Sequence, residues 1–253
     1  AKGKGVKVGI ICLFPEYFKS PLKYAPLKKA VEKGILEIRF FSIIDYAGGP
    51  KDVEDYQYGG GEGMVLKVNY MVKAIEDAKN WLKNAPVFLL SSSGKRINQE
   101  DIKEIAKLPE IIMIGGHYKG IDSRIYDYID VEISIGDFIV SSGELASLVV
   151  LDAVVRLLEG VLTHRGSAET DSFYDNLLES PVYTRPYDFE GKKVPDILLS
   201  GNHKAIALWR REQALKRTLL FRPDLLKKAN LDERDKEILR KIASEVCEIV
   251  KVL

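Results

Sequence analysis

The chain has 253 residues, of which 46% are hydrophobic and 30% are charged. Lys and Arg number 38 against 37 Asp and Glu, so the composition excludes a polybasic coat protein and a disordered chain. No apolar run approaches the roughly 18 residues of a membrane span, and the two distant cysteines, Cys12 and Cys247, offer no disulfide framework or metal clamp. We therefore expect a cytoplasmic protein, without membrane association, that forms one large domain or two modest ones.

Apolar runs alternate with helical patterns along the first 160 residues. Four runs predict strands, at residues 7–13, 35–43, 87–90 and 111–114, and all but 35–43 have the nearly continuous apolar character of strands covered on both faces. Helical patterns are predicted at 25–33, 68–82, from 98, from 122 and at 143–158. Residues 131–141 predict a strand, a turn and a second strand, whereas residues 45–64 predict a loop rich in glycine. This alternation predicts an α/β fold with a mostly parallel sheet.

Glycine and serine gather where three of the predicted strands end, at residues 91–94, 115–120 and 134–136. Ligands of parallel α/β sheets bind outside the carboxyl ends of the strands. The three strand exits therefore predict a pocket walled largely by main chain, although each exit taken alone is equally typical of an ordinary turn.

The character of the chain changes after Gly160. Residues 161–175 include a small and polar stretch that predicts a flexible interdomain linker, and residues 176–253 predict a small all-helical domain. Its stretch 204–228 carries eight Lys or Arg against two acids. The helical pattern gives this stretch a basic face, which predicts contacts with RNA phosphates through Lys204, Arg210, Arg211 and Arg217. An ordinary solvated helix face would explain the same charges.

Several common catalytic motifs are absent from the sequence. It contains no GxGxxG fingerprint, no Walker A loop and no GxSxG nucleophile elbow, and its three histidines lack the spacing of metal ligands. The sequence therefore predicts no metal site. Its chemistry would have to come from acid–base groups, from positioning and from a reactive second substrate.

Seven motifs occur in order between Val6 and Leu226. They are LFPE (13–16), YGGGEGM (58–64), GHYKGID (116–122), SIGDFIVSSGE (134–144), TDSF (170–173), YTRP (183–186) and LSGNH (199–203). Together they resemble the bacterial tRNA (guanine-N1)-methyltransferases, a family of knotted RNA methyltransferases. The resemblance implies an enzyme that methylates N1 of guanosine 37 of tRNA, just 3′ of the anticodon, with S-adenosyl-L-methionine as methyl donor and an aspartate as general base.

The resemblance also implies an architecture. Residues 1–160 would form an α/β domain that binds the methyl donor and carries a trefoil knot in its C-terminal part, residues 161–175 the flexible linker, and residues 176–253 a helical tRNA-binding domain. Two chains would form a homodimer and share each active site. A Mg²⁺ requirement is suggested for the family, but the sequence shows no ligand cluster for it.

Functional residues follow from the same resemblance, position by position. Asp171 corresponds to the general base and Arg156 to the catalytic arginine. The residues implied to bind the donor are Leu89, Leu90, Ser91, Ser92, Gly116, Tyr118, Lys119, Gly120, Ser134, Ile135, Gly136, Asp137, Phe138, Ile139, Val140, Ser142 and Gly143. Three of these depart from the family pattern: Lys119 replaces the usual glutamate, Ser92 a common proline and Ser142 a second glycine.

Two alternatives remain open from the sequence. One is a knotted RNA methyltransferase that acts on a different atom, and the other is a non-catalytic nucleotide-binding or RNA-binding module. Asp171 taken alone is also typical of a residue that caps a following helix.

Overall fold

The computed structural model describes residues 5–116, 120–162 and 171–252. The chain divides into two compact units, residues 1–165 and residues 166–253. Most of the predicted linker, residues 163–170, lies outside the described residues. In the part of the chain that is described, no helix is both long and apolar enough to cross a membrane.

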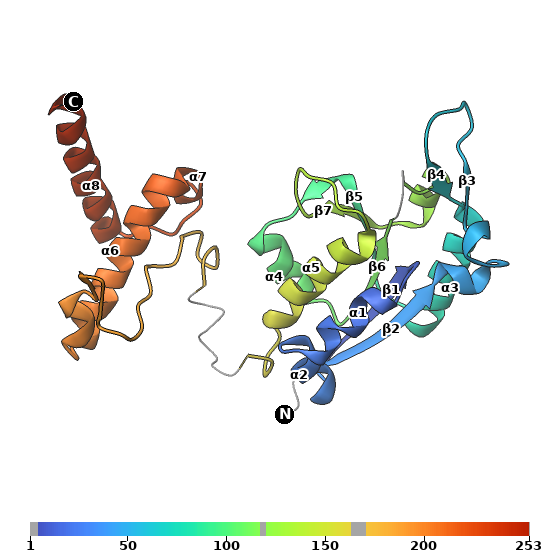
Figure 1. Cartoon of the computed structure of the whole chain (residues 1–253), viewed down its shortest axis with the longest axis horizontal. Coiled ribbons are helices and arrows are strands. Elements are labelled where there is room, and N and C mark those ends of the chain that lie inside the picture. Colours follow the sequence, from blue (N-terminus) through green and yellow to red (C-terminus); the bar gives the residue numbers. More distant parts are fainter. Residues whose placement is uncertain (1–4, 117–119, 163–170, 253) are drawn as a thin grey trace. The chain divides into compact units, whose positions relative to one another are not determined.

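A five-stranded parallel sheet forms the centre of the first unit (Figure 1). Its strands, in the order β2-β1-β6-β5-β7, are β2 (Leu36–Ser42), β1 (Val6–Cys12), β6 (Glu110–Gly115), β5 (Val87–Arg96) and β7 (Val131–Ser134). Four of them coincide with predicted apolar runs, so the predicted α/β fold with a mostly parallel sheet is confirmed.

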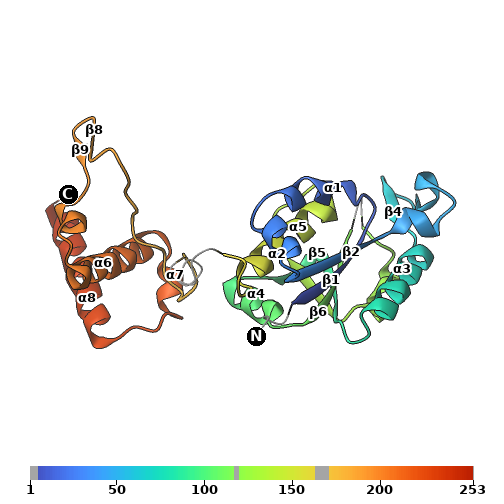
Figure 2. The ribbon, with the colours of Figure 1, turned by 90° about the horizontal axis from the view of Figure 1, so that it is seen from below.

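Helices cover both faces of this sheet. One face packs against α1 (Glu16–Lys19), α2 (Leu27–Glu32), α4 (Gln99–Ala106) and α5 (Gly143–Arg156). The other face packs against α3 (Val68–Trp81), which lies on the opposite side of the sheet from α5 (Figure 2). Successive residues of β1 point to opposite faces, so Ile10 is buried in the first core and Ile11 in the second. Burial on both faces explains the continuous apolar run of this strand.

The structure differs from the predicted elements in three places of the first unit. The predicted loop 45–64 contains part of a hairpin, formed by β3 (Glu54–Tyr56) and β4 (Met64–Leu66), and two 3₁₀ turns, Ile43–Tyr46 and Pro50–Asp52. A 3₁₀ helix, Ser123–Tyr128, replaces the helix predicted from 122. The second strand predicted within 131–141 is wrong, because β7 already forms the edge of the sheet and no strand follows it before α5, where Phe138 and Ile139 are exposed to 58% and 84%.

Within residues 171–252 the second unit has the α-helices α6 (His203–Phe221), α7 (Pro223–Leu226) and α8 (Glu233–Val252). The prediction of an all-helical unit is wrong in detail, because β8 (Asp188–Phe189) and β9 (Lys192–Lys193) form a short antiparallel hairpin. Its turn residues Glu190 and Gly191 both have positive φ, as the tight turns of hairpins require. Two further 3₁₀ turns complete the described elements, Pro21–Lys23 in the first unit and Asp196–Leu199 in the second.

Candidate functional site

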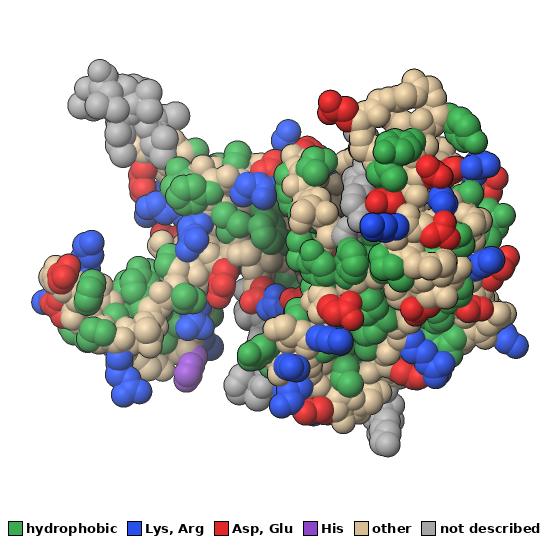
Figure 3. All heavy atoms as spheres, turned by 45° about the vertical axis from the view of Figure 1, so that its right-hand side comes forward, with side chains coloured by type: hydrophobic (Ala, Val, Ile, Leu, Met, Phe, Trp, Pro, Cys, Tyr) green, Lys and Arg blue, Asp and Glu red, His purple; other side chains and the backbone are tan. Residues whose placement is uncertain are grey.

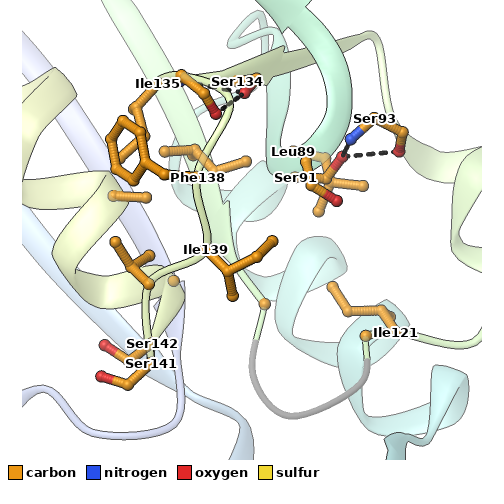
Figure 4. A pocket seen from close by; sticks show the side chains of 18 of the residues that line it. Leu89, Ser91, Ser93, Ile121, Ser134, Ile135, Phe138, Ile139, Ser141 and Ser142 are labelled. Carbon is orange, nitrogen blue, oxygen red and sulfur yellow. Dashed lines mark hydrogen bonds between the residues drawn. The ribbon is translucent and has the colours of Figure 1, made fainter.

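A cavity of about 360 Å³ lies beside β5 and beyond the ends of β6 and β7 (Figure 4). Its walls come from residues 89–93, from Gly116, and from parts of the segments 120–126 and 134–146. The three strand exits that the sequence singled out therefore meet around one cavity. A volume of this size is typical of a site for a small molecule.

All but three of the residues predicted to bind the methyl donor line this cavity. Tyr118 and Lys119 lie outside the described residues. Asp137 is absent from the described lining: its carboxylate is exposed and pairs with Arg96, with 2.7 Å between Nη1 and Oδ2, and its role in donor binding stays a prediction. Its neighbours Gly136 and Phe138 do line the cavity, so only this side chain of the loop points away.

Sequence reasoning missed seven lining residues, which are Ser93, Ile121, Ser123, Ile125, Tyr126, Ser141 and Ala146. The serine run 91–93 and the motif 134–144 already contained two of them. Ile121 through Tyr126 belong to the turn after β6, where Asp122 accepts a hydrogen bond from the Arg124 backbone N–H at 2.9 Å. An acidic residue three positions before the apolar Ile125 was the available signal for this turn.

Two strand exits approach each other so closely that there is no room for side chains. The N–H of Gly143 donates to the carbonyl of Gly116 at 2.7 Å. A Cβ placed on Gly143 would lie 2.3 Å from the Gly116 nitrogen and 2.4 Å from the Gly115 carbonyl carbon. Gly143 begins α5, so this contact fixes the start of the helix against the end of β6 at the wall of the cavity.

A buried carboxylate anchors the same end of α5 to β1. Glu144 is completely buried, and its Oε1 accepts hydrogen bonds from the backbone N–H groups of Leu13 at 2.9 Å and Phe14 at 3.0 Å. A negative charge in the first turn of a helix is also stabilised by the helix dipole. Burial, and then the charge of Glu144, raise the pKa of the neighbouring Cys12 thiol, so this cysteine stays protonated.

The glycine-rich segment 59–63 lies at the tip of the β3–β4 hairpin rather than in the cavity wall. The hairpin is nevertheless bonded to that wall. The N–H of Leu66 donates to the carbonyl of Gly120 at 3.1 Å, and the N–H of Asp122 donates to the carbonyl of Leu66 at 3.0 Å. The two segments therefore share one small network of main-chain bonds.

The two residues predicted to be catalytic are absent from the described lining of the cavity. Arg156 is the last residue of α5, ten positions beyond Ala146 in the cavity wall. At 1.5 Å per residue their Cα atoms are roughly 15 Å apart, which is more than an arginine side chain spans. Asp171 belongs to the second unit and begins a turn in which the Tyr174 N–H donates to its backbone carbonyl at 3.3 Å. Turns follow it rather than a helix, so the interpretation of Asp171 as a helix cap is wrong.

Three of the four residues predicted to bind tRNA, Lys204, Arg210 and Arg217, are exposed on α6. Lys and Arg side chains lie among apolar ones on the face of the second unit seen in Figure 3. Arg211 differs, because its guanidinium holds the nearly buried carboxylate of Asp235 on α8 through two hydrogen bonds of 2.9 and 2.6 Å. This pair holds α6 against α8 and lowers the pKa of Asp235. Arg211 therefore has a packing role in this structure, while its predicted contact with RNA stays a prediction.

Among residues 5–116, 120–162 and 171–252, no cluster of three or more His, Cys, Asp or Glu side chains is placed to hold a metal ion. The described side chains of the cavity wall are also uncharged. A ligand in this cavity would therefore be recognised by main-chain groups, hydroxyls and apolar side chains.

The fold and this cavity define an α/β protein with a small-molecule site at the carboxyl edge of a parallel sheet. A family model described as tRNA (guanine-1)-methyltransferase TrmD matches residues 6–228. The chain belongs to this family, which confirms the resemblance predicted from the seven motifs. It is accordingly an enzyme of the tRNA (guanine-N1)-methyltransferase class, and this finding disfavours the non-catalytic alternative.

Curated relatives agree over almost the whole chain. The tRNA (guanine-N(1)-)-methyltransferase of Caldanaerobacter subterraneus is 52% identical over 238 residues, covering 94% of this chain and 98% of the relative. The protein of the same name from Dictyoglomus turgidum is 46% identical over 246 residues, covering 97% and 100%. That from Sulfurihydrogenibium sp. is 47% identical over 238 residues and covers 94% of each chain.

Proposed function

We propose that this protein transfers a methyl group from S-adenosyl-L-methionine to N1 of guanosine 37 in tRNA. The observation that carries the proposal is the cavity where three strand exits meet, whose described side chains are uncharged, in a chain of this family. We further propose that the enzyme is cytoplasmic, that its first unit binds the methyl donor and that its second unit contacts tRNA. A Mg²⁺ requirement stays a prediction of the resemblance, since no described cluster offers ligands for it.

The residues present fit an adenosine-containing donor. Apolar side chains such as Leu89, Ile135 and Phe138 can cover a purine ring, and the main chain at Gly116 and Gly143 can approach a ligand without obstruction by a Cβ. The bound donor supplies an activated methyl group on a sulfonium. The protein therefore needs no nucleophile of its own, which agrees with the absence of a nucleophile motif from the sequence.

Asp171 and Arg156 would supply the acid–base chemistry. N1 of guanine carries a proton at neutral pH, so a base has to remove this proton as the methyl group arrives, and Asp171 is the proposed base. Loss of the proton places negative charge on O6 of the guanine. The guanidinium of Arg156 is always charged and would stabilise this oxygen through a fixed pair of N–H donors.

Two chains would have to combine to complete each active site. Arg156 is roughly 15 Å from the cavity wall of its own chain along α5. Leu145 and Val149 lie four residues apart on the same helix and expose 37% and 55% of their surface, an apolar stripe that continues toward Arg156 at helical spacing. A second copy packed on this stripe would bring its own cavity toward Arg156. This geometry supports the homodimer with shared active sites that the family resemblance implies.

The tight contact between Gly143 and the end of β6 also supports the proposed trefoil knot. A knotted chain has to pass one segment closely beside another, and glycine permits this approach at residues 115, 116 and 143. For tRNA, we propose contacts through Lys204, Arg210 and Arg217. Tyr183 lies beside Trp209 with 6.4 Å between ring centroids, so aromatic surface is available next to this basic face.

The proposed reaction can be tested by transfer of a labelled methyl group to unmodified tRNA transcripts. We expect 1-methylguanosine in a transcript with guanosine at position 37 and none when adenosine replaces it. Asp171→Asn should lower the transfer rate by at least about a hundredfold, because general-base catalysis contributes 10²–10⁴-fold, while donor binding stays unchanged. Label on another base, on ribose or on the adenosine transcript would contradict the proposal, as would an Asp171→Asn enzyme with normal turnover.

Mixed dimers test the shared active site. Asp171→Ala removes the base from one chain, and Gly116→Val fills the cavity of the other, where a Cβ at this position meets only Ile121 at 3.5 Å. Each variant alone should be inactive. If the cavity and the base of one active site come from different chains, the mixed dimer regains one working site. A mixed dimer as inactive as its parents would place the whole site in a single chain.

A further inference from the structure

One carboxylate accepts hydrogen bonds from three hydroxyl groups of the cavity wall. Glu132 lies on β7, and its Oε1 accepts hydrogen bonds from Ser91 Oγ at 2.5 Å, Ser93 Oγ at 2.8 Å and Tyr126 OH at 2.8 Å. All three hydroxyl-bearing residues line the cavity, and Figure 4 shows Ser91 and Ser93 side by side in its wall. Glu132 itself is absent from the described lining.

This arrangement fixes the direction in which the hydroxyls can bond. A hydroxyl has one proton to donate and two lone pairs that accept. The three protons have acceptors within this cluster, either Glu132 or, between the two serines, the other hydroxyl oxygen at 3.0 Å, so the oxygens offer a ligand only lone pairs. Ser91 Oγ also accepts from the backbone N–H of Ser93 at 3.0 Å, which holds the bulged part of β5 in place.

The charge of Glu132 is consistent with this role. Burial raises the pKa of its carboxyl group, but the hydrogen bonds from Ser91, Tyr126 and Ser93 together lower the pKa below its ordinary value. The group is therefore ionised at neutral pH and only accepts hydrogen bonds. The bond to Glu132 correspondingly raises the pKa of Tyr126, so the phenol keeps the proton that it donates.

We propose that Glu132 is a positioning residue that holds Ser91, Ser93 and Tyr126 as hydrogen-bond acceptors, so that the cavity selects a ligand group that donates. The identity of the ligand rests on the proposed function. The donating groups of S-adenosyl-L-methionine are its two ribose hydroxyls, its exocyclic amine and its ammonium group. A purely structural role for Glu132, in joining β5 to β7, would stabilise the fold without affecting which of these groups matters.

Calorimetric titration of the enzyme with S-adenosylhomocysteine and four analogues separates these roles. The analogues are the 2′-deoxy, the 3′-deoxy, the N6-dimethyl and the desamino compounds, each of which lacks one class of donor. In the natural chain we expect one analogue to bind at least about tenfold more weakly, because the bound analogue covers a hydroxyl acceptor without pairing it. In Glu132→Ala the hydroxyls can rotate and donate elsewhere, so the same analogue should bind less than about threefold more weakly than S-adenosylhomocysteine.

Single-hydroxyl variants identify the acceptor and remain informative if Glu132→Ala fails to fold. Either Ser93→Ala or Tyr126→Phe should abolish the loss of affinity seen with that analogue. Glu132→Gln keeps an acceptor oxygen, so it should show a larger part of this loss than Glu132→Ala does. Ser141→Ala is the matched control, since Ser141 also lines the cavity but lies apart from Ser91 (Figure 4).

The outcomes separate the two proposals. A natural chain that binds none of the compounds would overturn the proposed function. A natural chain that binds them while every variant keeps the same analogue penalties would overturn the role of Glu132 alone.

Discussion

The contact between Gly143 and the end of β6 gives a quantitative test of how the cavity is built. In Gly143→Ala the new methyl group would lie 2.3 Å from the Gly116 nitrogen and 2.4 Å from both the Gly115 carbonyl carbon and the Gly116 oxygen. These neighbours are main-chain atoms, which cannot rotate away as a side chain would. The two segments therefore have to separate, and the 2.7 Å hydrogen bond between Gly143 and Gly116 lengthens.

Two effects of this substitution oppose each other. Alanine is favoured over glycine in a helix by about 0.5–1 kcal/mol, and Gly143 is the first residue of α5. Overpacking costs about 1–3 kcal/mol and occasionally more, and three contacts near 2.4 Å with main chain place this site at the upper end. The net loss of unfolding free energy is therefore about 2 kcal/mol. For a unit of 165 residues that corresponds to a fall in Tm of about 4–8 °C.

Differential scanning calorimetry and titration with S-adenosylhomocysteine measure the two consequences. Gly116→Ala is the matched control, because its methyl group would meet only the Ile121 side chain at an ordinary 3.5 Å. We expect the control to melt within about 2 °C of the natural chain and Gly143→Ala to melt lower and bind more weakly. Equal melting temperatures for the two variants would refute the inference that main-chain contact builds this wall.

Three further predictions concern the second unit and the proposed dimer. Arg210→Ala and Arg217→Ala should each weaken tRNA binding and reduce the number of ions released on binding by about one. Filter binding across salt concentrations measures this number as the slope of log affinity against log salt, and an unchanged slope would remove that arginine from the interface. Arg211 lowers the pKa of Asp235, so the pair stabilises the second unit fully above the unfolded pKa near 4 and loses this stabilisation as the pH falls through the folded pKa. Asp235→Asn should therefore flatten the profile of melting temperature against pH at acid pH, and an unaltered profile would contradict this. Val149→Glu should produce monomers with little activity in sedimentation and methyl-transfer assays, whereas an active dimer would exclude this stripe as the interface.

The sheet and most of the cavity wall could be predicted from the sequence because their signals are local. Strands buried on both faces leave continuous apolar runs, and their glycine-rich and serine-rich ends mark the edge of the sheet where ligands bind. The capping box before α4 is equally local: Asn98 accepts from the backbone N–H of Asp101, whose side chain accepts in return from the N–H of Asn98.

Other features depend on residues that are distant in the sequence. The helical pattern places Arg211 on the polar side of α6, but only the packed helices reveal that Asp235, 24 residues later, meets it. Glu132 and Ser91 are 41 residues apart, so no local pattern indicates their bond. A motif also fails to show which side chain of a loop faces inward, which is why Asp137 was assigned to the wall although it pairs with Arg96.

The sheet order has a consequence for synthesis on the ribosome. β1 is made first but lies second in the sheet, beside β6, and its residues Val8, Ile10 and Cys12 belong to the core that α5 completes. At about 5–20 residues per second, roughly 7–30 s separate translation of β1 from that of α5. During this interval α1, α2 and α4 can pack on that apolar face, but the part of the core that α5 fills stays open, so the growing chain exposes apolar surface until its 156th residue leaves the exit tunnel.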